Sequence, residues 1–188
     1  DVVRDFGADS LRFYEMFMGP LEASLPWSTG GLDGAKRYLD RVYRLFTEET
    51  YTSKFTNEND GKLDFIYHTT VKKVTHDFEA LQFNTAISQM MILTNEFYKA
   101  DKIYIPYLEG FIKMFDCICP HLGEEIWEMM GHKDVIVYEA WPTYDEAKTK
   151  ENVITLAVQV NGKLRDKLDI PAGASKEETE KLALDSKK

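Results

Sequence analysis

Three arginines at helical spacing are the residues of this sequence best suited to binding chemistry. Arg37, Arg41 and Arg44 are separated by four and three positions, so on a helix they stack on one side. The opposite side of the same helix collects apolar and aromatic residues, which are Ala35, Tyr38, Leu39, Val42, Leu45 and Phe46. Guanidinium groups bind phosphate through paired hydrogen bonds. A helix that buries one side and presents arginines on the other is suited to lie on a nucleic-acid backbone.

The same arginines have a simpler interpretation that the spacing leaves open. Asp33, Asp40 and Glu48 lie three or four positions away from them, so the row could be a solvated face with ion pairs along the helix. The formal net charge of the 188-residue chain is −9, which argues against a general nucleic-acid coat. Any contact with nucleic acid must therefore be local.

A second basic group follows the dipeptide Asn161-Gly162. Lys163, Arg165 and Lys167 alternate along a predicted strand, where they could contact phosphate. Alternating charge also protects an edge strand from pairing with other chains, and this second interpretation stays open.

Motifs for catalysis or metal binding are not found in this sequence. It has no phosphate-cradling glycine-rich loop, no general acid–base pair and no metal-ligand set, so we predict no catalytic and no metal residues. Cys117 and Cys119 stand in an apolar run and lack the spacing and further ligands of a zinc site. They are expected to be two buried thiols in a reducing compartment.

Hydrophobic periodicity predicts a mainly α protein built as an antiparallel helical bundle. Helices are expected over residues 6–18 and from Asp33, as N-cap, to about residue 52, with a polar connection over 53–62. Two further segments broken only by residues 81–84 predict a helical hairpin, and Pro106 and Pro120 are placed to begin two more helices. Trp127 falls on the apolar side of the last of these. With 44% hydrophobic residues the chain can bury a substantial core, and no apolar run reaches the length of a membrane span.

The pattern changes after Gly131, and a small α+β piece is expected. Ile154, Leu156, Val158 and Val160 alternate with period two, Asn161-Gly162 is a strong hairpin turn, and a final helix is predicted over residues 174–184. The predicted domains are a connecting segment over residues 1–30, a helical domain over 31–145 and a truncated unit over 153–188. The last has only about 35 residues, fewer than usually fold alone.

Several of these segments together resemble one family. GADSLRFYEMFMGPLEAS (residues 7–24), GLDGAKRYLDRVYRLF (31–46), FNTAISQMMILTNEFYK (83–99), PHLGEEIWEMMG (120–131) and VQVNGKLRDKLDIPAGASKEE (158–178) occur in the order found in bacterial-type leucyl-tRNA synthetases, which are class I enzymes. The resemblance covers essentially the whole chain. It identifies the chain as a C-terminal fragment that comprises the anticodon-binding helical domain and the start of the C-terminal domain.

The resemblance implies a tRNA-docking role. The full enzyme attaches leucine to its tRNA with ATP and magnesium, whereas the fragment is expected to hold no cofactor and to be non-catalytic. The implied partners are leucine-accepting tRNA and the catalytic and editing domains of the same chain, with no membrane and no DNA, in the cytoplasm. The implied tRNA-binding residues are Arg37, Arg41, Arg44, Lys163 and Arg165.

Two rival interpretations remain open. PHLGEEIW also fits isoleucyl- and valyl-tRNA synthetases, although EMFMGPLEAS together with VQVNGKLRDKL points to the leucyl enzyme. A helical protein-interaction module without an RNA role would need an exposed apolar stripe, and the sequence predicts none outside the hairpin unit.

Overall fold

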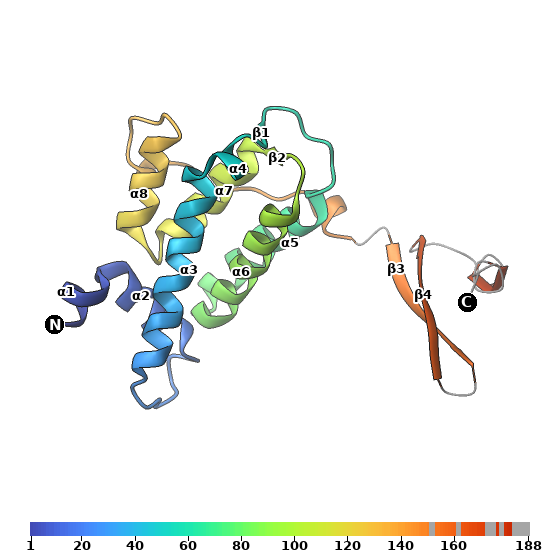
Figure 1. The fold of residues 1–188 in the computed structure, drawn as a ribbon, viewed down its shortest axis with the longest axis horizontal. Coiled ribbons are helices and arrows are strands. Elements are labelled where there is room, and N and C mark those ends of the chain that lie inside the picture. Colours follow the sequence, from blue (N-terminus) through green and yellow to red (C-terminus); the bar gives the residue numbers. More distant parts are fainter. Residues whose placement is uncertain (151–152, 161–162, 172–175, 177–178, 182–188) are drawn as a thin grey trace.

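The protein is a bundle of helices followed by a two-stranded hairpin (Figure 1). The computed structural model describes residues 1–150, 153–160, 163–171, 176 and 179–181, and for the strands within 153–171 it describes the backbone alone. The mainly α fold class with a small β piece is therefore confirmed. The elements in chain order are α1 Val2–Phe6, α2 Ala8–Phe17, α3 Thr29–Thr47, α4 Glu49–Thr52, β1 Phe55–Thr56, α5 Asp64–Glu79, α6 Phe83–Lys99, β2 Ile103–Tyr104, α7 Ile105–Asp116, α8 Pro120–Met129, the 3-10 turns η1 Ile136–Tyr138 and η2 Glu146–Thr149, β3 Val153–Val160 and β4 Lys163–Pro171.

The helical hairpin predicted in the middle of the chain is formed by α5 and α6. The two helices pack against each other along their length, and the short connection over residues 80–82 makes them antiparallel. The prolines lie where the sequence placed them, since Pro106 is in the first turn of α7 and Pro120 begins α8. At these positions the missing N–H of proline needs no partner within the helix.

The start of α3 differs from the expectation. The helix begins at Thr29, with Ser28 as N-cap, and the Ser28 Oγ accepts a hydrogen bond from the Gly31 N–H at 3.2 Å. Asp33 therefore lies inside the helix and is not its cap. A side chain at Gly31 would meet the Tyr14 ring at 2.6 Å, so this glycine allows the first turn of α3 to approach α2 closely. The far end also differs, because α3 stops at Thr47 and α4 follows as a separate turn.

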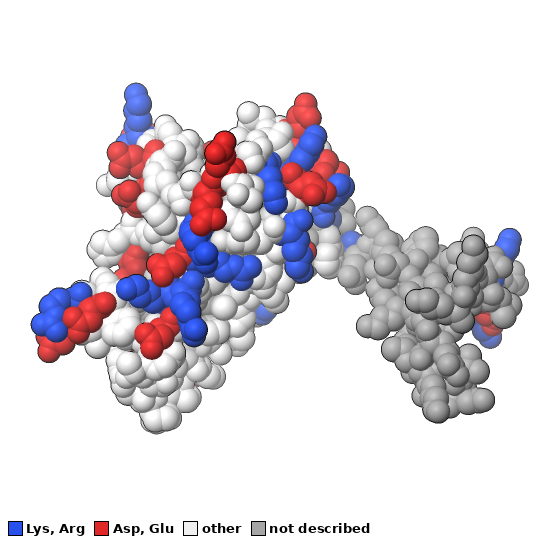
Figure 2. Space-filling view, viewed as in Figure 1, with Lys and Arg blue, Asp and Glu red and all other residues white. Residues whose placement is uncertain are grey.

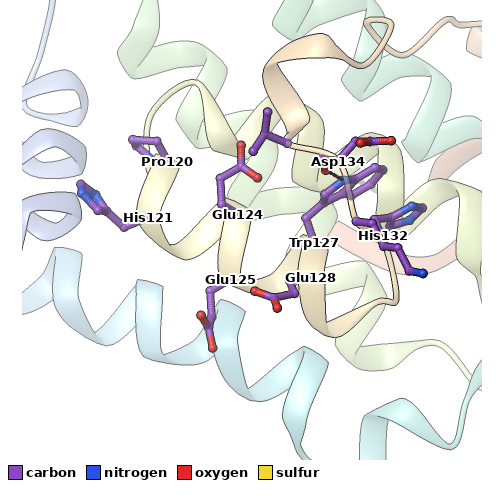
Figure 3. A pocket seen from close by; sticks show the side chains of 10 residues that line it. Pro120, His121, Glu124, Glu125, Trp127, Glu128, His132 and Asp134 are labelled. Atoms are coloured by element: carbon purple, nitrogen blue, oxygen red, sulfur yellow. Dashed lines mark hydrogen bonds between the residues drawn. The ribbon is translucent and has the colours of Figure 1, made fainter.

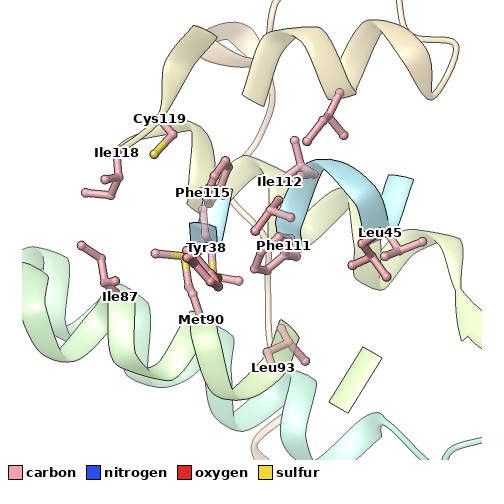
Figure 4. Packing of buried hydrophobic residues seen from close by; sticks show 14 of the residues in the cluster. Tyr38, Leu45, Ile87, Met90, Leu93, Phe111, Ile112, Phe115, Ile118 and Cys119 are labelled. Atoms are coloured by element: carbon pink, nitrogen blue, oxygen red, sulfur yellow. The ribbon is translucent and has the colours of Figure 1, made fainter. Parts of the chain in front are cut away.

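The hydrophobic core lies where α3, α6 and α7 meet (Figure 4). Phe111 and Phe115 of α7 are fully buried and stack with centroids 5.7 Å apart, and Met90 and Leu93 of α6 face them. Tyr38 of α3 is buried in this core and its hydroxyl is hydrogen bonded to Thr94 Oγ1 of α6 at 2.9 Å. This pair satisfies two polar groups that would otherwise cost free energy in an apolar interior.

Segment α2 belongs to the same packed body. Phe13 and Tyr14 are buried, and α2 contacts α3, α6 and α8. The division of the chain at residue 30 stays a prediction, but residues 8–17 pack as part of the bundle. The prediction that both cysteines are buried is half wrong, because Cys119 is buried whereas Cys117 is exposed.

The turn between α7 and α8 is held by side chains that come from α2, over 100 residues away. The buried Asp9 carboxylate accepts hydrogen bonds from the Leu122 N–H at 2.7 Å and from His121 Nδ1 at 2.8 Å. Asp9 thereby caps α8 at its positive end, where a carboxylate is stabilising. Arg12 Nε donates to the Ile118 carbonyl at 2.8 Å, just beyond the last turn of α7.

A carboxyl without a hydrogen bond lies beside this turn. Asp116 Oδ1 is buried and has no partner within the described part of the chain. Burial, together with the nearby charges of Glu124 and Asp9, raises the pKa of Asp116 to about 6. Gly123 allows this packing, because a Cβ there would lie 2.5 Å from Asp116 Oδ1.

Asp116→Asn is expected to stabilise the protein at pH 7.5. In the wild type the folded pKa of Asp116 lies above its unfolded value of roughly 4, so the native state binds more protons between about pH 4 and pH 6 and stability falls as the pH rises through that window. The variant removes this penalty. Urea unfolding of both proteins at pH 7.5 and 4.5 measures the difference in their free energies of unfolding. This difference, in favour of the variant, should shrink at the lower pH. An advantage of equal size at both values would assign the effect to packing and not to ionisation.

The polar connection contains a structure that the sequence did not reveal. Phe55 and Thr56 form β1, which pairs in parallel with Ile103 and Tyr104 of β2.

The charged segment after α8 is anchored on α5. Lys148 of η2 lies 2.7 Å from Asp64, and the Trp141 indole donates to Thr75 Oγ1 at 2.8 Å. Trp141 thus fixes the segment after α8 onto the bundle.

The predicted β-hairpin is present. Strands β3 and β4 pair antiparallel, from Val153 opposite Pro171 to Val160 opposite Lys163. A bulge interrupts the register, because Gln159 opposes Leu164 whereas Val158 opposes Asp166. Asn161-Gly162, the predicted turn, lies outside the described residues. Of the helix expected over residues 174–184, residues 176 and 179–181 are described, and they are helical.

Candidate nucleic-acid interface

The outward side of α3 carries the arginines that the sequence singled out. Leu32, Leu39, Val42 and Leu45 are buried on its inner side, which fixes the rotation of the helix. The residues on the opposite side of the helix must then face solvent. The spacing argument is confirmed in this respect, because Arg37 and Arg44 are exposed. Figure 2 shows basic groups gathered over α3, with acidic groups among them.

Arg41 differs from its two neighbours because it is tied to α6. Its Nη1 donates to Asn95 Oδ1 at 2.6 Å, and its guanidinium lies over the Tyr98 ring, 4.4 Å from the centroid. The Tyr98 hydroxyl in turn donates to the Arg41 carbonyl at 2.7 Å. These contacts join α3 to α6, so Arg41 is half-buried and has fewer donors left for a ligand than Arg37 or Arg44.

Arg37 and Arg44 border a shallow hollow on the outer side of α3. Its volume is about 500 Å³ and its lining consists of Arg37, Asp40, Tyr43 and Arg44. Neither arginine lies within 4.0 Å of a carboxylate in the described part of the chain. The ion pairs with Asp33, Asp40 and Glu48 that would make the row a solvated ladder are thus not formed. Two guanidinium forks with unused donors on the border of one hollow are suited to bind phosphates of one nucleic-acid backbone.

The second predicted group, Lys163 and Arg165, lies in β4. The side chains of Lys163 and Arg165 lie outside the described residues, and only their backbone positions in β4 are known. Lys163 opposes Val160, while Arg165 is the extra residue of the bulge. Their role in binding stays a prediction.

A larger hollow lies along α8, and its chemistry is different (Figure 3). Glu124, Glu125 and Glu128 lie along this helix. At the end of the hollow away from His121, Trp127 stacks on His132 with ring centroids 3.5 Å apart. The Glu124 carboxylate accepts a hydrogen bond from the Ile136 N–H at 3.0 Å. A hollow lined by carboxylates repels phosphate, so α3 is the better candidate for contact with a nucleic acid.

Two exposed features were missed by the sequence analysis. Tyr43 is 41% exposed on the polar side of α3, and an aromatic residue out of phase with the apolar stripe was the signal that could have found it. Leu21, Leu25 and Trp27 are about half-exposed in the loop between α2 and α3. This loop is an exposed apolar surface of the kind that the sequence analysis did not expect in the helical part.

No helix in the described part of the chain combines the length and apolar character needed to cross a membrane.

Comparison with known proteins gives two findings. The sequence model of the family described as "Anticodon-binding domain of tRNA ligase" matches residues 63–181. This range begins after α3 and continues through the hairpin. Among solved structures, the chain is similar to that of agnB2 LeuRS from Agrobacterium radiobacter K84, in a ternary complex with tRNA and LeuAMS. The sequences are 30% identical, the TM-score is 0.77, and the match covers 98% of this chain. The chain spans about a quarter of that protein, 26% of its length, and α3 lies within the matched region.

Proposed function

Because the chain belongs to the family of anticodon-binding domains of tRNA ligases, we propose that it is the tRNA-docking part of a leucyl-tRNA synthetase. The observation that carries the proposal is the pair Arg37 and Arg44, exposed on a helix whose other side is buried and without carboxylate partners in the described residues. The similar LeuRS chain, solved together with tRNA, supports the leucyl assignment over the isoleucyl and valyl alternatives.

In this proposal the chain positions tRNA and does not perform chemistry. Contacts between arginine and phosphate fix register and orientation but carry little sequence information, so specificity comes from the shape of the folded RNA. The rigid seam between α3 and α6, built from Tyr38, Arg41 and Tyr98, holds the binding helix in place. The proposed site comprises Arg37, Arg41 and Arg44, with Lys163 and Arg165 as its second part.

The proposal extends to the other parts of a full-length synthetase. Leucine attachment with ATP and magnesium would take place in the catalytic domain, in the cytoplasm. The exposed Leu21, Leu25 and Trp27 support a contact between the α2–α3 loop and the catalytic or editing domain, because apolar surface of this kind is normally covered by a partner.

A titration with labelled RNA tests the proposal. We expect leucine-accepting tRNA to bind this chain at least about tenfold more tightly than a tRNA for another amino acid, with an affinity that falls steeply as salt increases. Duplex DNA should not displace the tRNA at equal concentration. Fluorescence anisotropy at two salt concentrations measures the affinity for each tRNA, its salt dependence and the competition by DNA. Equal binding of both tRNAs and of DNA would show only a general polyanion surface.

A further inference from the structure

The hollow on α3 contains more than a phosphate site requires. Phosphate contact needs only the two arginines, yet the hollow between Arg37 and Arg44 also presents the Tyr43 ring and the Asp40 carboxylate. Tyr43 is 41% exposed and forms no ring stacking in the described residues, so its face is available to a ligand. Asp40 is exposed and has no cation within 4.0 Å in the described part of the chain. An unpaired carboxylate in a phosphate site is unfavourable unless it has its own ligand group.

These four side chains match the parts of one nucleotide that is not base paired. Single-stranded RNA is bound by stacking its bases on aromatic rings and by hydrogen bonds to their Watson–Crick edges. On that edge guanine has two neighbouring donors, N1–H and the N2 amino group, which fit the two oxygens of a carboxylate. Adenine and cytosine offer one amino donor next to a ring acceptor, which would face the second carboxylate oxygen. The carboxylate therefore favours guanine.

We propose that the hollow formed by Arg37, Asp40, Tyr43 and Arg44 binds one unpaired guanine nucleotide of the docked tRNA. The base stacks on Tyr43, its N1–H and N2 amino groups donate to Asp40, and the phosphates on either side contact Arg37 and Arg44. This inference rests on the proposed tRNA-docking function, and it adds a base-reading element to a surface that otherwise reads only the backbone.

Chemical footprinting locates the nucleotide. Kethoxal reacts with guanine at N1 and N2 when these atoms are not paired, so leucine-accepting tRNA can be probed with and without the protein. We expect one unpaired guanine to become protected by the wild type and by Tyr43→Phe, which keeps the ring. Tyr43→Ala should leave the same guanine reactive at protein concentrations that saturate the tRNA. Protection that persists in Tyr43→Ala would overturn the proposal.

The charge of Asp40 gives a test with opposite signs. If Asp40 is only a negative charge close to phosphates, Asp40→Asn will strengthen tRNA binding. If it accepts hydrogen bonds from guanine, the variant will weaken binding by roughly tenfold, because the asparagine amide cannot accept both donors. Asp33→Asn, an exposed aspartate on α3 outside the hollow, is the matched control.

Salt dependence separates this proposal from the tRNA-docking function. Tyr43→Ala should weaken binding roughly tenfold without changing the slope of affinity against salt, since stacking releases no counterions. Loss of Arg37 and Arg44 should change that slope. If the arginine variant behaves as expected and Tyr43→Ala binds like the wild type, docking stands and the nucleotide site is wrong. If neither variant changes binding, the nucleotide site is wrong and the α3 arginines take no part in tRNA docking.

Discussion

Trp127→Ala is expected to lower the free energy of unfolding by about 3–5 kcal/mol. Trp127 is 2% exposed, and its indole N–H donates to the Asp134 carbonyl at 3.0 Å. One side of the ring stacks on His132, and the Lys113 ammonium lies 5.4 Å from its centroid. The substitution leaves a large cavity between α7 and α8 and an unpaired carbonyl in the loop that follows α8.

Urea unfolding followed by circular dichroism measures this loss without depending on tryptophan fluorescence. Trp127→Phe is the matched control, because it keeps most of the ring volume but loses the hydrogen bond to Asp134, and we expect it to cost about 1–2 kcal/mol. A loss below about 1 kcal/mol for the alanine variant would contradict the buried position of Trp127. The ring would then be available for other contacts, such as stacking on a base.

Those parts of the fold that depend on neighbouring residues could be predicted from the sequence. The period of 3.6 identified α5 and α6, and Pro106 and Pro120 marked the starts of α7 and α8. Trp127 was assigned to the core by the same periodicity, and its burial confirms this. In each case the signal lies within one helix, where spacing alone determines which residues share a side.

Features that depend on distant contacts were not predicted. The α3 N-terminus was placed too late because Gly30 and Gly31 are poor helix formers, yet close packing of Gly31 on Tyr14 favours the helix there. The cap that Asp9 provides to α8 joins residues more than 100 positions apart. The pairing of β1 with β2 likewise spans a long separation and involves two residues from each strand. No local pattern can reveal contacts of this kind.

The candidate site was predicted in its position but not in its composition. Helical spacing gave the arginine row and its exposed side, whereas spacing could not show that Arg41 is bound to Asn95 and Tyr98 of α6. It also could not show that Tyr43 and Asp40 share a hollow with Arg37 and Arg44. The three arginines therefore need to be tested separately, since loss of Arg41 would disturb the packing of α3 on α6.

A variant with both Arg37→Gln and Arg44→Gln is expected to weaken tRNA binding roughly tenfold to a hundredfold, uniformly across tRNA sequence variants. Removing one arginine that neutralises a phosphate should reduce the slope of log affinity against log salt by about 0.7–0.9, so the double variant should show about twice that reduction. Glutamine is a good helix former and both sites are exposed, so α3 should stay folded and the unfolding curve should be unchanged.

In a full-length synthetase carrying this double change, leucine activation should be unaffected, whereas charging should show a raised apparent KM for tRNA. Lys62→Gln with Lys133→Gln removes two exposed charges away from α3 and is the matched control. Arg41→Gln should instead lower stability, because it removes the contacts to Asn95 and Tyr98. If the double variant charges tRNA normally and keeps the wild-type salt slope, the α3 arginines are a solvated face. An unchanged salt slope would mean that the α3 arginines neutralise no phosphate. Binding would then have to come from Lys163 and Arg165 or from another part of the synthetase.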